Sequence, residues 1–147
     1  MRRLGSGRRR GRIVIMAKVF VERTEDGFVG TNERGARVAI GGSKDDGVFS
    51  PVELLLVALG GCELVTVEPL TAKRGHRLVR LAIRVEAEKV EPTKLGPITG
   101  TYEIELPEGD SEAAEVFRAV AERVHENHCT VGKALREPTP TIQVLPV

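Results

Sequence analysis

Alternating apolar and polar residues predict three short strands near the N-terminus. The segments 18–22, 27–30 and 36–40 are rich in β-favouring residues, and turn-forming residues separate them. Segments this close together most simply form an antiparallel meander. The next segment, GGSKDDG at 41–47, consists of turn-forming residues and predicts a loop.

A long apolar helix is predicted after this loop. Ser50 can cap it, Pro51 suits its first position, and Glu53 lies three residues after the cap, which together form a capping box. The residues that follow, LLLVALGGCELVTV, are apolar on nearly every side, so we expect the helix to be buried all round, in a domain core or a subunit interface. Pro69 cannot donate a helical hydrogen bond, and we expect the helix to kink or end near it, before residues 73–75.

Two adjacent glycines interrupt this apolar helix. Gly60 and Gly61 each weaken a helix by about 1 kcal/mol relative to alanine. Their simplest explanation is that another helix or strand packs closely against this turn. We therefore expect a close neighbour beside Cys62.

Two further strands and a second helix are predicted in the second half of the chain. Residues 79–90 alternate between apolar and charged side chains, and residues 99–109 predict an antiparallel partner strand. An apolar stripe over 111 to about 127 predicts a helix lying on this sheet. A short helical turn carrying Cys129 and a final strand at 141–147 complete the order. Because the strands come in antiparallel runs, the fold class is α+β.

The composition indicates an ordinary globular protein of one domain. The 147 residues are 41% hydrophobic and 29% charged, and we place a single domain at 17–147. The first twelve residues hold six arginines among glycines, so residues 1–16 predict a mobile basic tail. Such a tail is also compatible with a nucleic-acid-binding arm, or with an upstream extension if Met16 is the true start.

Charge, aromatic content and hydropathy narrow the choice of partners. A net charge of +1 and 3% aromatic residues without tryptophan argue against a nucleic-acid partner. We expect no apolar stretch of membrane-spanning length, and the N-terminus lacks the pattern of a signal peptide. Two cysteines without a CxxC pair argue against a secreted disulfide framework. These features predict a cytoplasmic protein without a membrane partner.

The two cysteines are the candidates for chemistry. A free cysteine is often only a small buried hydrophobic residue, whereas reactivity requires a thiolate. Cys129 has His128 beside it and Lys133 four residues on, near a predicted helix start, so local sequence favours it as the easier thiolate. Cys62 lies in mid-helix beside Glu63, and its ionisation would need a cation from elsewhere in the fold.

Two motifs resemble those of the OsmC/Ohr family. The segment SPVELLLVALGGCELVTV, in which a cysteine follows nine residues after a glutamate, is similar to the central helix of that family. The segment HCTVGKAL is similar to its second-cysteine motif. The predicted order of elements from about residue 17 to 147 is similar as well. The resemblance implies antiparallel sheets around a buried central helix, in an intertwined homodimer with both active sites at the subunit interface.

The resemblance also implies an activity. It suggests a cysteine-based peroxidase that reduces organic hydroperoxides, with an antioxidant role in the stress response and no cofactor. Cys62 would attack the peroxide and become a sulfenic acid, and Cys129 would resolve it as a disulfide. A dithiol or lipoyl reductant would then restore both thiols.

A carboxylate and an arginine complete the site that the resemblance implies. Glu53 would orient a catalytic arginine, for which Arg37 is the first candidate, with Arg34 and Arg23 less well placed. On an ideal helix, nine residues put Glu53 and Cys62 on roughly opposite faces, so a third group must connect them. The arginine is expected to supply that link.

Two alternatives stay open. A metal site could use side chains of suitable ligand type that lack a compact spacing, namely Cys62, Cys129, His125 and His128. Alternatively, the fold could form a homodimer with little or no peroxidase activity and a structural or small-molecule-binding role, because no local motif identifies the arginine. Fast alkylation of a thiol at neutral pH would favour the enzyme.

Overall fold

A computed structural model describes residues 17–146 of the chain. These residues form two compact units divided after Ser50, and each unit is described by itself. The predicted basic tail at 1–16, with the possible start at Met16, lies outside the described residues, as does Val147.

The first unit is a three-stranded antiparallel sheet in the order β1-β2-β3, which confirms the predicted meander. The Asn32 side chain fixes the second turn, where its Oδ1 atom accepts hydrogen bonds of 3.0 Å from the backbone N–H groups of Arg34 and Ala36. The segment 41–47 contains no helix or strand, as its turn-forming residues predict. The strands are β1 (Val19–Thr24), β2 (Gly27–Asn32) and β3 (Arg37–Ile40).

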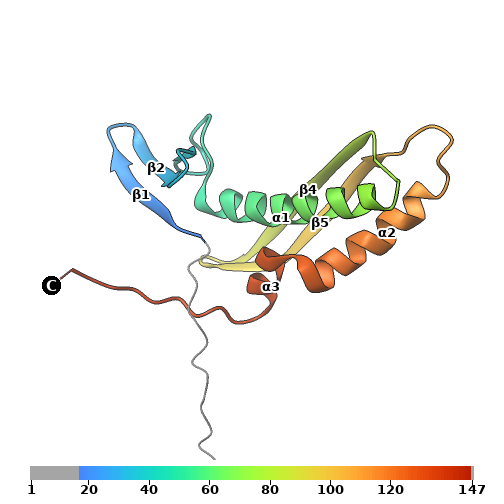
Figure 1. Cartoon of the computed structure of the whole chain (residues 1–147). Helices are drawn as coiled ribbons and strands as arrows, with labels where there is room; N and C mark the ends of the chain where they lie inside the picture. The colour runs from blue at the N-terminus through green and yellow to red at the C-terminus, as the bar shows by residue number, and fades with distance from the viewer. Residues whose placement is uncertain (1–16, 147) are drawn as a thin grey trace, which may run out of the picture. The chain divides into compact units, whose positions relative to one another are not determined.

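The second unit packs helices against a long hairpin. Helix α1 (Pro51–Lys73) lies along the hairpin of β4 (Arg80–Glu91) and β5 (Lys94–Glu105), and the C-terminal helices also contact α1 (Figure 1). Those helices are α2 (Ala113–Arg123), a π-helical turn (Val124–His128) and α3 (Thr130–Arg136). The antiparallel β4–β5 pairing and the start of α1 at Pro51 confirm the predictions.

The core of this unit lies where α1, α2 and the π-helical turn meet. Its buried members include Val67 of α1, Phe117 of α2 and Cys129. Tyr102 of β5 packs edge-to-face on Phe117, with ring centroids 5.2 Å apart. Such aromatic pairs stabilise a fold by about 0.5–1.5 kcal/mol beyond the area they bury. The hairpin and α2 are thereby joined across the core.

The two glycines of α1 have different surroundings. A β-carbon at Gly60 would come within 3.0 Å of Val85 and 3.1 Å of Ile83, so β4 packs directly on this turn. A β-carbon at Gly61 would meet nothing within 4 Å. The expected close neighbour therefore exists at Gly60 and is absent at Gly61 within the described part of the chain.

Helix α1 is not buried all round, contrary to expectation. Val57 and Val65 are 52% and 72% exposed, because β4, α2 and α3 cover only part of the helix surface. The expectation that no apolar stretch would reach membrane-spanning length was also wrong, since α1 passes that test by length and composition. The core helix of a soluble protein passes the same test. This finding alone is therefore only weak evidence for a helix that spans a membrane.

Two boundaries also differ from the predictions. Helix α1 runs through Pro69 to Lys73, and the chain then turns at Gly75, which has a φ of +81°. The predicted final strand is absent from residues 137–146, where Ile142 and Val144 are 89% and 88% exposed. A strand needs a neighbour for its backbone hydrogen bonds, and the described residues supply none to this segment.

Candidate active site

The fold brings the two cysteines together. Cys62 is half-buried in the middle of α1 and packs against the core cluster that contains Cys129. Cys62 contributes to the raised pKa of the Cys129 thiol, so the two side chains are near enough to interact. Both cysteines are free thiols, so the pair forms a dithiol site between α1 and the start of α3.

Burial controls the acidity of Cys129. The side chain is 2% exposed, and this burial raises the pKa of the thiol to about 12. A backbone N–H group of α3 opposes the rise, because Gly132 donates to Sγ at 3.3 Å, while Cys62 and the charge of Glu63 add to it. Cys129 does cap a helix, as the sequence suggested. Burial raises the pKa of the thiol by more than the hydrogen bond from Gly132 at this cap lowers it. The pKa of Cys129 is therefore raised, which is opposite to the direction that the local sequence indicated.

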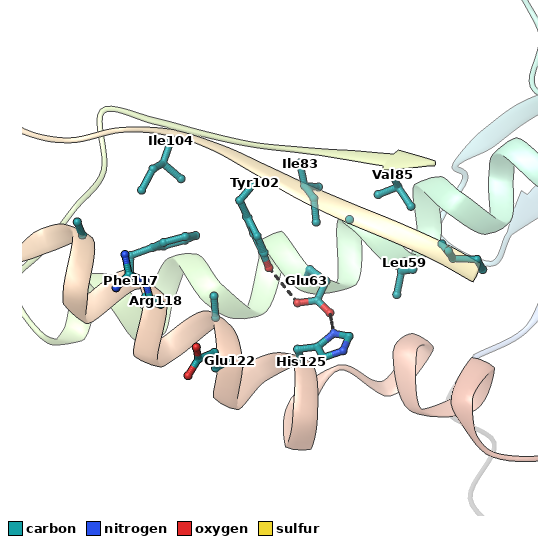
Figure 2. Close-up of a pocket in the computed structure, with 14 residues that line it drawn as sticks. Leu59, Glu63, Ile83, Val85, Tyr102, Ile104, Phe117, Arg118, Glu122 and His125 are labelled. Carbon is teal, nitrogen blue, oxygen red and sulfur yellow. Dashed lines mark hydrogen bonds and ion pairs between the residues drawn. The ribbon is translucent and has the colours of Figure 1, made fainter. Parts of the chain in front are cut away.

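A buried carboxylate follows Cys62 directly in the sequence of α1. Glu63 is 4% exposed and accepts a 2.9 Å hydrogen bond from the Tyr102 hydroxyl. Its other oxygen lies 3.3 Å from Nδ1 of His125, whose side chain is 63% exposed (Figure 2). Burial and the Glu63 acceptor hold the pKa of Tyr102 well above its usual range. Glu63 thus connects the half-buried hydroxyl of Tyr102 to an imidazole at the surface.

A groove of about 550 Å³ opens beside this carboxylate. Its walls are apolar side chains from the four main elements of the second unit, with Glu63, Tyr102 and His125 grouped together along it (Figure 2). This volume and composition are typical of small-molecule sites. The apolar walls include Leu59, Ile83, Val85, Ile104 and Phe117.

The predicted carboxylate and arginine lie in different units. Arg37 is exposed at the start of β3 in the first unit, whereas Glu53 is exposed in the first turn of α1. Because α1 is continuous, Glu53 lies about 13 Å along the axis from Cys62, on roughly the opposite face. Glu53 therefore cannot contact Cys62 of its own chain, and the roles of Glu53 and Arg37 stay predictions.

The alternative ligand set does not gather at one point. Within residues 17–146, no group of three or more His, Cys, Asp and Glu side chains could hold a metal ion. His125 instead contacts Glu63, which was not among the candidate ligands.

The Glu63, Tyr102 and His125 cluster was missed from the sequence. Its one visible signal was the placement of an acidic residue in an apolar helix, where a carboxylate is costly to bury unless it is paired. Its partners follow 39 and 62 residues later, so no local spacing connects them.

Comparison with known proteins agrees with this architecture. The fold and the thiol pair define an α+β protein with a dithiol site built on a long central helix. The family model described as OsmC-like protein matches residues 43–144, and the chain belongs to that family. The resemblance seen in the two cysteine motifs is thereby confirmed.

Individual proteins are also similar to this chain in sequence or in fold. An uncharacterized protein of Mycobacterium tuberculosis H37Rv is 32% identical over 126 residues, which cover 84% of this chain and 92% of the relative. The crystal structure of an OsmC-like protein from Mycoplasma pneumoniae has a TM-score of 0.65 at 19% identity and covers 86% of this chain and 91% of its own. An OsmC-like protein of unknown function from Vibrio cholerae has a TM-score of 0.65 at 12% identity, covering 82% and 94%. The two structures share the fold.

Proposed function

We propose that the protein is a thiol-dependent peroxidase that reduces organic hydroperoxides. The observation that carries the proposal is that Cys62 packs against the core cluster that contains Cys129, although the two cysteines are remote in the sequence. Two free thiols of one cluster can form a disulfide when their sulfurs come within bonding distance. Membership in the OsmC-like family agrees with this chemistry.

The reaction would proceed in two steps at the thiol pair. The Cys62 thiolate attacks the outer oxygen of the hydroperoxide, the O–O bond breaks, and the alkoxide takes a proton and leaves as an alcohol. Cys62 is then a sulfenic acid. The Cys129 sulfur attacks the Cys62 sulfur, the S–O bond breaks, and water leaves as the disulfide forms. Cys62 is the attacking thiol because Cys129 is the more deeply buried of the two and has a raised pKa.

A dithiol would close the cycle by thiol–disulfide exchange. Its first thiolate attacks the Cys62–Cys129 disulfide and forms a mixed disulfide, which its second thiol resolves. A small or lipoyl dithiol suits a partly covered disulfide, because both of its sulfurs are on one molecule. No cofactor takes part in this cycle.

A homodimer would complete the site. The exposed row of Val57, Gly61 and Val65 lies at helical spacing on α1, and the extended tail at 141–146 has no strand partner among the described residues. A second copy of the chain could cover the exposed row on α1 and pair with the tail at 141–146. Because Glu53 cannot contact Cys62 in one chain, we propose that Glu53 and Arg37 act on the thiols of the partner.

Two cysteine variants test the proposal. Reduced wild-type protein should consume cumene hydroperoxide repeatedly when dihydrolipoamide is supplied. Cys62→Ser should abolish consumption, whereas Cys129→Ser should consume one equivalent and leave a sulfenic acid that dimedone traps. Mass spectrometry identifies the trapped residue. Undiminished turnover in Cys62→Ser would refute the assignment.

The groove beside Glu63 favours one other function. A site of about 550 Å³ with apolar walls and a buried carboxylate could bind a small apolar molecule without redox chemistry. The rate of thiol alkylation distinguishes the peroxidase from the binding protein. If neither thiol reacts faster than free cysteine at neutral pH, the binding function is favoured over the peroxidase.

A further inference from the structure

The resolving step of the proposed peroxidase faces an energetic obstacle at Cys129. With a pKa of about 12, only about one Cys129 thiol in 100,000 is ionised at pH 7. A sulfenic acid waiting for this thiolate would be exposed to further oxidation. Efficient resolution therefore needs a nearby group that accepts the thiol proton.

We propose that Glu63 and His125 form a proton shuttle for the step in which Cys129 attacks the oxidised Cys62. This inference rests on the proposed peroxidase function and deepens it. Glu63 is the only charged side chain that is buried among residues 17–146, and it directly follows Cys62 in α1. A buried carboxylate is costly to keep unless its partners hold it in place.

The Glu63 carboxylate is linked both to the cluster that contains Cys129 and to a side chain at the surface. Glu63 lies one helical turn before Val67, which packs in the same cluster as Cys129, and its charge acts on the Cys129 thiol. Tyr102 and His125 hold one carboxylate oxygen each (Figure 2). The imidazole of His125 is mostly exposed, so a proton that reaches Glu63 has a route to water.

The elements around the groove contribute few other charges. Arg118 and Glu122 of α2 line the groove but are exposed to solvent, and β4 lines it with apolar Ile83 and Val85. From β5 the polar neighbour is Tyr102, whose raised pKa keeps it a hydrogen-bond donor. Glu63 is therefore the buried base of this region.

The shuttle leaves the step balanced in protons and electrons. Glu63 accepts the proton of the Cys129 thiol, and the resulting thiolate forms the S–S bond with Cys62 as the S–O bond breaks. His125 relays this proton between Glu63 and the solvent, and the departing hydroxide takes one proton from the same relay and leaves as water. The Cys129 sulfur is oxidised, the Cys62 sulfur is reduced, and no proton is gained or lost overall.

The variant Glu63→Gln tests this role, because glutamine still accepts a hydrogen bond from Tyr102 but cannot carry the proton. Reduced full-length protein is mixed with one equivalent of cumene hydroperoxide, and sulfenic acid and disulfide are followed by mass spectrometry. We expect Glu63→Gln to form the sulfenic acid at nearly the wild-type rate and the disulfide about 100-fold more slowly at pH 7. Glu68→Gln, on the exposed side of the same helix, should behave as wild type.

The direction of the change in the rate of disulfide formation, and the dependence of that rate on pH, distinguish proton transfer from a structural or electrostatic effect. Removing the charge of Glu63 alone would lower the pKa of Cys129 and speed disulfide formation. The shuttle instead predicts slowing, with a rate in Glu63→Gln that rises about tenfold per pH unit and a weaker dependence in wild type. Equal or faster disulfide formation in Glu63→Gln would overturn the inference.

Two further outcomes keep this inference distinct from the peroxidase proposal. If wild-type protein forms no sulfenic acid, the peroxidase proposal fails. The shuttle proposal then fails with it, because the step in which Cys129 attacks the oxidised Cys62 does not occur. If Glu63→Gln does not fold, His125→Asn decides, because this side chain is exposed and its replacement should leave the core intact. A disulfide rate in folded His125→Asn equal to wild type would count against the shuttle, whereas a roughly tenfold loss would support it.

Discussion

The hydroxyl of Tyr102 donates a 2.9 Å hydrogen bond to the carboxylate of Glu63 and so joins β5 to the middle of α1. The same tyrosine ring packs on Phe117 of α2. One side chain therefore connects three elements of the second unit at the point where the thiol pair lies. The stability of this unit and the chemistry proposed for it depend on the same contact.

Tyr102→Phe should lower the free energy of unfolding by about 1.5–3 kcal/mol, because it removes a hydrogen bond to a buried charge and keeps the ring contact. Urea unfolding followed by circular dichroism measures the change. Thr101→Ala, at an exposed position of the same strand, should change stability by less than about 0.5 kcal/mol. Similar stabilities for Tyr102→Phe and wild type would show that the hydrogen bond contributes little.

The two glycines of α1 form a matched pair for a packing test. Gly60→Ala should destabilise the protein by about 1–3 kcal/mol, because the new methyl group would press on Val85 and Ile83 of β4. Gly61→Ala has open space in its own chain and should stabilise the helix by about 1 kcal/mol. Thermal unfolding of both variants, made in a Val65→Glu background that keeps the proposed dimer apart, gives the comparison. An equal loss at the two positions would contradict the asymmetric packing.

Cys129 should be a slow nucleophile when it is the only thiol. In Cys62→Ser, the rate of alkylation by iodoacetamide at pH 7 should be at least about 100-fold below that of free cysteine, because the buried thiol stays protonated. The rate should rise about tenfold per pH unit while the protein stays folded. Unfolding in urea should restore ordinary reactivity. A fast reaction in the folded state would mean that the thiol is exposed or ionised.

The same raised pKa predicts a loss of stability in alkali. The unfolded chain releases the Cys129 proton near pH 8.5, whereas the folded chain holds it until about pH 12. Between these values the unfolded state binds fewer protons, so the free energy of unfolding should fall as pH rises. Cys129→Ala should show a shallower fall in urea titrations from pH 8 to 11. Parallel profiles in both proteins would contradict the pKa shift.

The proposed homodimer predicts a large effect from one exposed position. Val65 is 72% exposed in the middle of α1, and Val65→Glu would place a charge in the proposed interface. Wild-type protein should have the mass of a dimer in light scattering at micromolar concentration, and Val65→Glu should have that of a monomer. Val90→Glu, at the far end of β4, serves as the control because Val90 is also exposed. A monomeric wild type would end the dimer proposal.

The sequence predicted those features that short-range patterns encode. The capping box of Ser50 and Glu53, with Pro51 at the first helical position, correctly predicted the start of α1, and alternation over 79–90 correctly indicated β4. The two cysteine motifs identified the family. Each of these signals lies within one element, where periodicity and capping preferences act directly.

The features that were predicted wrongly or missed depend on contacts between residues that are distant in the sequence. The acidity of Cys129 could not be read from His128 and Lys133, because the deciding influence is burial in a core assembled from several elements. The partners of Glu63 come from β5 and the turn after α2, which no spacing rule connects. The strand expected at 141–147 failed because pairing requires a second strand that the described residues do not offer.

The π-helical turn between α2 and α3 carries an evolutionary consequence. Such a turn holds one residue more than an α-helical turn, and here it is closed by the Cys129 N–H group donating to the Val124 carbonyl at 2.8 Å. A homologue that is one residue shorter at 124–128 would rewind this stretch and swing the position after it by about 100° around the helix axis. A deletion in this stretch should therefore move Cys129 away from its place in the core, even in homologues where both cysteines still align.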